Sequence, residues 1–103
     1  MKRYDVRLSP EAETDLVDIY RYISAASQSR TVARQYLDRV TSYLSSFEVF
    51  PERGSLRNDV RQGLRVVGFE RTISIAFIVE DGSVIILRVA QNGQQLNLSD
   101  TRQ

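Results

Sequence analysis

Isolated arginines in a chain without histidine are the residues whose chemistry stands out. Residues 61–90 read as three consecutive strands that carry Arg65, Arg71 and Arg88 among apolar side chains. A guanidinium presents a planar fork of donors that matches a phosphate or a carboxylate. Histidine, the usual proton carrier near neutral pH, is absent from all 103 residues. This combination favours holding an anionic surface over acid–base catalysis.

More arginines lie in the segment that precedes these strands. Residues 53–65 carry Arg53, Arg57, Arg61 and Arg65 against a single acid, Asp59, although the whole chain has a net charge of only +1. Four cations in one segment create a local positive field that suits an anionic partner. The alternative is an ordinary solvated loop. For Arg53 and Arg57 the solvated loop is the favoured interpretation, and for the others both stay open.

Composition excludes several classes of protein. Without cysteine there is no disulfide, cysteine nucleophile or thiolate metal site, and without histidine a zinc site would need carboxylates alone. We therefore expect no metal and no cofactor. No run is long enough to span a membrane, and the charged start lacks the apolar core of a signal peptide, which predicts a cytoplasmic protein with no membrane partner. The length and the 42% apolar content predict one domain over 1–103, with a polar tail from about 97.

A strand and two amphipathic helices are predicted in the first half of the chain. Residues 3–8 alternate, with Tyr4, Val6 and Leu8 on one face. Ser9 and Pro10 then form a helix start, and this helix fades within residues 24–29. A second helix is expected over about 31–47, antiparallel to the first. The apolar stripes of the two helices are Ala12, Leu16, Ile19, Tyr20 and Ile23, and then Ala33, Tyr36, Leu37, Val40, Leu44 and Phe47.

Three strands are predicted in the second half, at about 63–69, 71–80 and 83–90, after a loop at 51–60. The pair Asp81–Gly82 predicts a type I′ hairpin turn. With those two residues at the centre, Phe77 pairs with Ile86, and Ile75 pairs with Arg88. That register places Arg88 at the margin of the apolar face. The fold class is α+β in the order β-α-α-β-β-β, an antiparallel helix hairpin packed on a mainly antiparallel sheet.

These residues, taken together, resemble the ParE/RelE superfamily of bacterial type II toxins, in its ParE-like branch, over nearly the whole chain. A Pro–x–x–Gly follows the helices at Pro51 and Gly54, and Gly–Leu–Arg stands at residues 63–65. The closing strand reads Ile–Leu–Arg–Val at residues 86–89. The segments that carry the resemblance are LSPEAETDLVDIYRYI, FPERGS, QGLRVVGF and ISIAFIVEDGSVIILRVAQNGQQ.

The resemblance implies a toxin neutralised by a cognate antitoxin. In such pairs a ParD-like antitoxin carries the ribbon-helix-helix DNA-binding domain, so no sequence-specific DNA binding is expected from this chain alone. The antitoxin wraps a segment over the toxin, and such a disordered segment gains its order on binding. Its candidate contacts here are Leu16, Tyr20, Arg65 and Arg88.

The two branches of the superfamily differ in action. RelE-like members cut messenger RNA on the ribosome, whereas ParE-like members poison DNA gyrase as binding proteins. Nuclease members place a His or Tyr late in the chain, but here that position is Gln91, whose amide cannot transfer protons. The favoured hypothesis is therefore a gyrase-binding inhibitor with no catalytic residue. Its candidate target contacts are Arg61, Arg65, Arg71, Arg88, Gln91 and Asn92.

Two alternatives stay open. One is a ribosome-dependent RNA endonuclease in which Glu70 or Glu80 is the base, although both are better explained as turn carboxylates. The other is a degenerate member without toxicity that acts only as a binding module.

Overall fold

Serine caps begin both helices of the computed structural model, which describes residues 2–91. Helix α1 (Pro10–Ser27) starts where the Ser9 Oγ accepts the Ala12 N–H at 3.0 Å. Gln28 ends α1 in the left-handed conformation, so α1 continues through most of the stretch where the sequence predicted it to fade. Ser29 caps α2 (Arg30–Ser45) by accepting the Val32 N–H. A 3₁₀ turn, η1 (Ser46–Glu48), extends α2.

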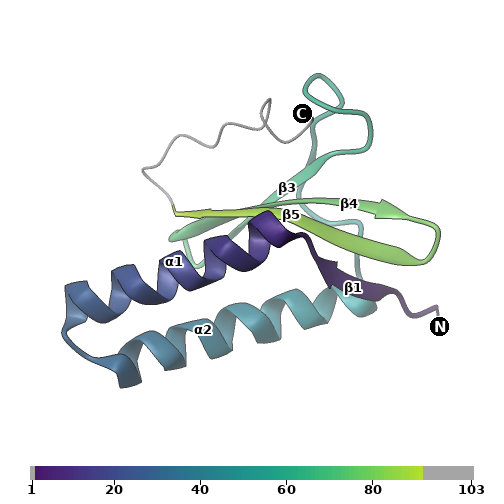
Figure 1. Ribbon diagram of the computed structural model, residues 1–103. Helices are drawn as coiled ribbons and strands as arrows, with labels where there is room; N and C mark the ends of the chain where they lie inside the picture. The colour runs from purple at the N-terminus through teal and green to yellow at the C-terminus, as the bar shows by residue number, and fades with distance from the viewer. Residues whose placement is uncertain (1, 92–103) are drawn as a thin grey trace.

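The two helices lie side by side on one face of a five-stranded sheet (Figure 1). The strands are β1 (Asp5–Leu8), β2 (Ser55–Leu56), β3 (Arg65–Phe69), β4 (Ile73–Glu80) and β5 (Ser83–Gln91), in the spatial order β1-β5-β4-β3-β2. Strand β1 runs parallel to β5, and every other pair is antiparallel. This confirms the predicted α+β class, helix hairpin and mainly antiparallel sheet.

Strand β2 was not predicted, because two residues are too few to show an alternation. It lies within the segment expected to be only a loop, and it pairs with the start of β3. Gly54 makes this pairing possible, since its φ is +76° and a Cβ there would lie 2.3 Å from the Val66 carbonyl oxygen. The Pro51–x–x–Gly54 spacing therefore has a steric cause in the close approach of β2 to β3.

The β4–β5 hairpin confirms the predicted turn and corrects half of the predicted register. Asp81 and Gly82 both have positive φ, and Phe77 pairs with Ile86 as expected. Beyond Phe77 a β-bulge shifts the pairing. The predicted partnership of Ile75 with Arg88 is therefore wrong, because Arg88 lies opposite Ala76 and Ile75 lies opposite Val89.

The bulge has a packing reason that the apolar spacing of β5 could have revealed. Val84, Ile86 and Val89 all enter the main core with at most 2% of their surface exposed, although the last step covers three residues instead of two. An extra residue must therefore lie between Ile86 and Val89. Leu87 packs in a second apolar cluster, so β5 contributes to two clusters.

Most of the predicted helix stripes enter the main core between helices and sheet. The buried members of this core are Ala12, Ile19, Tyr36, Val40, Leu44, Phe47, Ile73, Ile75, Phe77, Val84, Ile86 and Val89. Leu8, expected to be inside, is 36% exposed because β1 is an edge strand. A smaller cluster is formed by Leu64 and Ala76, with Val60, Val66, Ile78 and Leu87 packed against them. Over residues 2–91, neither helix has the length and apolarity that a membrane crossing needs.

Candidate functional site

Arg88 is held in place by helix α1. Strand β1 ends at Leu8, opposite Ile86, while β5 continues to Gln91. Helix α1 covers the part of the β5 edge that has no pairing with β1. The Asp15 carboxylate on α1 accepts the Val89 N–H at 2.8 Å. It also accepts Nε and Nη2 of Arg88, at 2.9 and 3.0 Å. Asp15 thus satisfies a strand amide and forms a bidentate ion pair with the neighbouring residue.

The burial of this ion pair limits what Arg88 can do. The side chains of Arg88 and Asp15 are 33% and 12% exposed. A bidentate pair occupies two donors of the guanidinium and compensates its charge. Arg88 therefore joins α1 to β5, and its role in binding a target or an antitoxin stays a prediction.

Arg53, expected to face solvent, instead packs against the end of α2. Its Nε donates to the Phe50 carbonyl at 2.6 Å, and its other nitrogens donate to the Ser46 hydroxyl and carbonyl at 2.9 and 3.0 Å. The guanidinium also lies 4.2 Å from the ring centroid of Phe47 and 5.3 Å from that of Tyr43. A cation here complements the negative end of the helix. The interpretation of Arg53 as a solvated loop residue was wrong.

Arg61 and Arg65 flank a tight turn before β3. The Arg57 N–H donates to the Leu64 carbonyl, the Leu64 N–H donates to the Arg61 carbonyl, and fully buried Leu64 anchors the turn. Arg65 follows as the first residue of β3, opposite Phe77 of β4. Both arginines are partly exposed. Within residues 2–91, neither guanidinium has a hydrogen bond or an ion pair, so their charges remain available on the surface.

Arg57, in the same turn, differs from these two because Asp59 pairs with it. Its Nε and Nη2 donate to the Asp59 carboxylate at 3.1 and 3.2 Å. This hydrogen bond lowers the pKa of Asp59 and raises that of Arg57. The pair is exposed, as the solvated-loop interpretation of Arg57 expected.

Arg71 and Gln91 lie at the opposite end of the sheet from Arg65. Arg71 is in the β3–β4 turn, and Gln91 pairs with Ile73 at the start of β4. Arg65 is four residues from the other end of β3, a distance of about 13 Å along the strand. The candidate target residues therefore form two groups instead of one patch. Asn92, the remaining candidate, lies outside the described residues.

A shallow groove of about 490 Å³ contains Arg71 and Gln91. One side of the groove is formed by a bidentate ion pair, in which Arg39 of α2 donates to the Glu70 carboxylate at 2.9 and 3.2 Å. That hydrogen bond lowers the pKa of Glu70. Glu70 and Arg71 both have positive φ, at 52° and 59°, so a strained turn shapes this rim. The lining residues are Tyr22, Ile23, Tyr36, Arg39, Glu70, Arg71, Thr72 and Gln91.

The two antitoxin candidates on α1 are less exposed than some other apolar side chains of the same helix. Leu16 is half-buried against the main core, and Tyr20 is also half-buried. The apolar side chains that α1 exposes most are Val17 at 49% and Tyr22 at 61%. Neither was among the antitoxin candidates drawn from the sequence, because both lie off the buried stripe.

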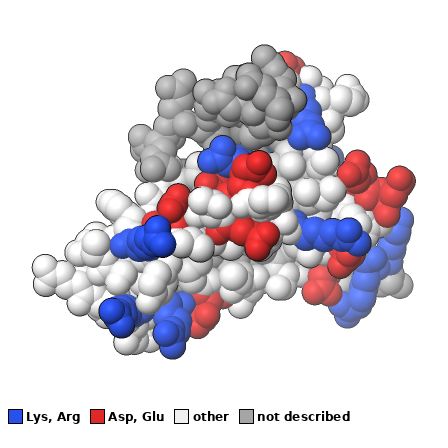
Figure 2. All heavy atoms as spheres, in the orientation of Figure 1, with Lys and Arg blue, Asp and Glu red and all other residues white. Residues whose placement is uncertain are grey.

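The described surface carries mixed charge, and the two glutamates considered as bases lie in different settings. Figure 2 shows acidic and basic side chains interspersed on the face that includes α1. Glu70 is in the ion pair with Arg39, and a carboxylate with a lowered pKa is a weak base. Glu80 is exposed beside the β4–β5 turn. Over residues 2–91, no three acidic side chains gather into a metal site.

Comparison with known proteins identifies the class to which this fold and surface belong. A family model for the ParE toxin of the type II toxin–antitoxin system parDE matches residues 6–96. The chain therefore belongs to the ParE toxin family. No curated protein matches it.

Two solved toxin–antitoxin structures share its fold. A chromosomal ParDE system from P. aeruginosa is similar with a TM-score of 0.74 and 20% sequence identity, over 86% of this chain and 96% of that one. A RelBE toxin–antitoxin complex from Mycobacterium tuberculosis is similar with a TM-score of 0.64 and 22% identity, over 91% of this chain and 97% of that one. Both neighbours agree with the predicted ParE/RelE fold.

Proposed function

We propose that this toxin inhibits DNA gyrase by binding it, without cleaving nucleic acid. The observation that carries the proposal is the contrast between Arg88 and the pair Arg61 and Arg65. Arg88 is committed to Asp15, while Arg61 and Arg65 present charge at the surface. An exposed guanidinium can dock on acidic protein surface or on phosphate held by the target. Gyrase, which holds DNA, offers both.

The same contrast argues against the endonuclease alternative. A nuclease would need arginines such as Arg65 and Arg88 to hold phosphate, but Asp15 already occupies the fork of Arg88. Cleavage also needs a proton acceptor. The chain has no histidine, and the pKa of Glu70 is lowered by Arg39. Binding therefore accounts for these residues better than catalysis does.

A ParD-like antitoxin is the proposed partner that neutralises the toxin. Membership of the parDE family and the two solved neighbours, both toxin–antitoxin assemblies, support such a partner. An acidic antitoxin segment would pair with Arg61 and Arg65, gaining order as it binds. The proposed target also implies a cytoplasmic location.

The test compares two assays on the purified protein. We expect inhibition of gyrase supercoiling with accumulated cleavage complexes, and intact messages in a translation extract. Arg65→Ala and Arg61→Ala should each weaken gyrase inhibition by about tenfold or more if they are interface anchors. Arg57→Ala is the matched control in the same turn, because Asp59 already pairs with it, and it should change inhibition by less than about twofold.

Two results would contradict the proposal. Cut messages with unaffected gyrase would establish the endonuclease alternative. Inactivity in both assays, from protein that still binds its antitoxin, would establish a binding module without toxicity.

A further inference from the structure

The outer edge of β1 directs backbone groups away from the sheet. The Asp5 N–H donates to the Gly82 carbonyl and the Ser9 N–H to the Ile86 carbonyl, each at 2.9 Å. Because backbone groups of a strand alternate in direction, Val6 and Leu8 point their N–H and C=O groups to the other side. Strand β1 is at the end of the sheet order, so that side faces no further strand of the described chain.

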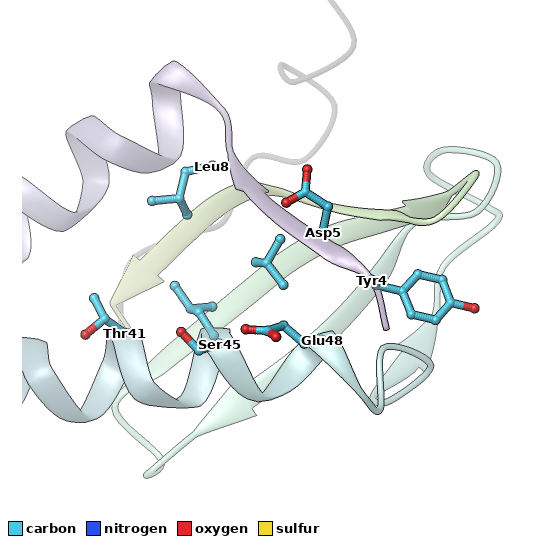
Figure 3. A pocket seen from close by; sticks show the side chains of 8 residues that line it. Tyr4, Asp5, Leu8, Thr41, Ser45 and Glu48 are labelled. Carbon is cyan, nitrogen blue, oxygen red and sulfur yellow. The ribbon is translucent and has the colours of Figure 1, made fainter. Parts of the chain in front are cut away.

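A groove beside this edge leaves room for another strand. It has a volume of about 390 Å³ and lies between β1 and the last turns of α2 with η1 (Figure 3). Thr41 and Ser45 are short side chains, so a backbone can approach α2 there. Val6 and Leu44 add apolar surface. The lining residues are Tyr4, Asp5, Val6, Leu8, Thr41, Leu44, Ser45 and Glu48.

The charges of β1 suit a second copy of the same strand. Asp5 and Arg7 are 61% and 69% exposed, and the carboxylate of Asp5 points away from α2 (Figure 3). Edge strands are commonly protected by charges that repel another edge. Here the two charges have opposite signs and are two residues apart. In an antiparallel pair centred on Val6, Asp5 of each copy lies opposite Arg7 of the other.

We propose that two copies of this chain associate through β1, antiparallel and in register at Val6, to form a continuous sheet across a twofold axis. In this register the outward groups of Val6 meet those of Val6 in the second copy. Leu8 then lies opposite Tyr4 of the second copy and donates to its carbonyl. Such a self-complementary contact is isologous and closes as a dimer.

The dimer is weak and concentration-dependent. The Tyr4 N–H already donates to the Glu48 carbonyl at 2.8 Å, which ends the available edge at that point and keeps the paired segment short. Asp5 and Arg7 already pair within one chain at 2.8 Å. Exchanging that bond for a contact between copies adds little affinity, so the charges set the register more than the strength. A pairing over so few residues buries little surface, which is typical of transient interfaces.

Sedimentation velocity over a wide range of protein concentration tests the proposal. The free toxin should shift from monomer to dimer as concentration rises. Asp5→Arg or Arg7→Asp alone places like charges opposite each other, and each should lower the association constant by about tenfold. Both side chains are exposed, so we expect these substitutions to preserve the fold. The double variant Asp5→Arg/Arg7→Asp restores complementarity and should recover the dimer.

A mixture of the two single variants provides a sharper test. In the proposed register, Asp5→Arg and Arg7→Asp complement each other, so the mixture should form a heterodimer at concentrations where each variant alone is a monomer. Amide exchange adds an independent readout, since the Val6 amide should become more protected as the wild-type concentration rises.

The outcomes that overturn the proposal are equally defined. A wild type that stays monomeric at the highest concentration contradicts it. So does a dimer that survives Asp5→Arg unchanged. If the free toxin is monomeric and the single variants weaken only antitoxin binding, the edge serves the antitoxin instead of a second copy.

Discussion

Two pairs of arginines in this molecule differ in whether their guanidinium groups have acceptors within the fold. Arg53 and Arg88 lie where helices meet the sheet and its loops, and each donates to acceptors from another element. Arg61 and Arg65 lie around the turn before β3, with no acceptor for their guanidinium groups in residues 2–91. One pair stabilises the fold, and the other presents charge.

The difference between these pairs depends on what lies opposite each side chain. Arg88 lies on β5 just beyond the residues that pair with β1, and α1 places a carboxylate beside this unpaired edge. Arg53 donates to the hydroxyl and carbonyl of Ser46 in η1 and to the Phe50 carbonyl just beyond η1. The turn at residues 57–64 closes mainly through its own backbone, which leaves Arg61 without such an acceptor. An arginine becomes structural where the end of an element places acceptors within its reach.

Removing Asp15 should have the largest effect on stability. Asp15→Ala removes a carboxylate, only 12% exposed, that accepts from both the Val89 amide and the Arg88 guanidinium. We expect the free energy of unfolding to fall by about 3 kcal/mol. Urea denaturation followed by circular dichroism measures it.

Asp15→Asn is the matched control, because its amide oxygen still accepts the Val89 N–H. It should cost clearly less than Asp15→Ala. An alanine variant as stable as wild type would show that Arg88 is not a structural residue, and the contrast between the two arginine pairs would be lost.

Arg53→Ala should have the next largest effect. The change removes the donors to Ser46 and Phe50 and the contact with the Phe47 ring. The expected loss is about 2 kcal/mol in the same denaturation experiment. Arg53→Lys keeps the charge but not the planar fork, so it should recover only part of the stability. Full recovery by lysine would mean that charge alone matters at this position.

The ion pair between Arg39 and Glu70 gives a smaller, pH-dependent effect. Arg39 lowers the pKa of Glu70 below its ordinary value of 4.5. The folded state therefore binds a proton less readily than the unfolded state, and this contribution is present above that value and lost as the pH falls below it. The pair is exposed, so the contribution is small.

Glu70→Gln isolates this contribution. The glutamine keeps the size of the side chain at a residue with positive φ but does not titrate. Wild type should be slightly more stable than Glu70→Gln at pH 7, and the difference in urea midpoint should vanish in acid. A difference that grows as the pH falls would show the opposite sign of coupling.

Local signals in the sequence were sufficient for much of the fold. Ser9, Pro10 and the pair Asp81–Gly82 each satisfy a backbone requirement within a few residues, so their roles were predictable. Strand β2 could not be predicted in this way, because only its pairing with β3 makes these two residues a strand. The bulge left a trace in the spacing of Val84, Ile86 and Val89, but the hairpin turn alone gave the wrong register beyond Phe77.

The candidate site was less predictable than the fold. The sequence identified the arginines but could not separate Arg88 from Arg65, because the partner of Arg88 is 73 residues away on another element. It also grouped Arg71 with Arg65, whereas the strand order places them at opposite ends of β3. Such long-range pairings depend on the packing of α1 against β5, which no local pattern encodes.

The smallest effect on stability should come from the other arginine pair. The double variant Arg61→Ala/Arg65→Ala removes two guanidinium groups that have no acceptor within residues 2–91, so the free energy of unfolding should change by less than about 0.5 kcal/mol. The same variant should lose gyrase inhibition. A large loss of stability would mean that these residues also hold the fold, since a surface residue kept for a partner should affect binding and leave folding unchanged. Stability and inhibition measured on one protein preparation therefore decide to which pair each arginine belongs.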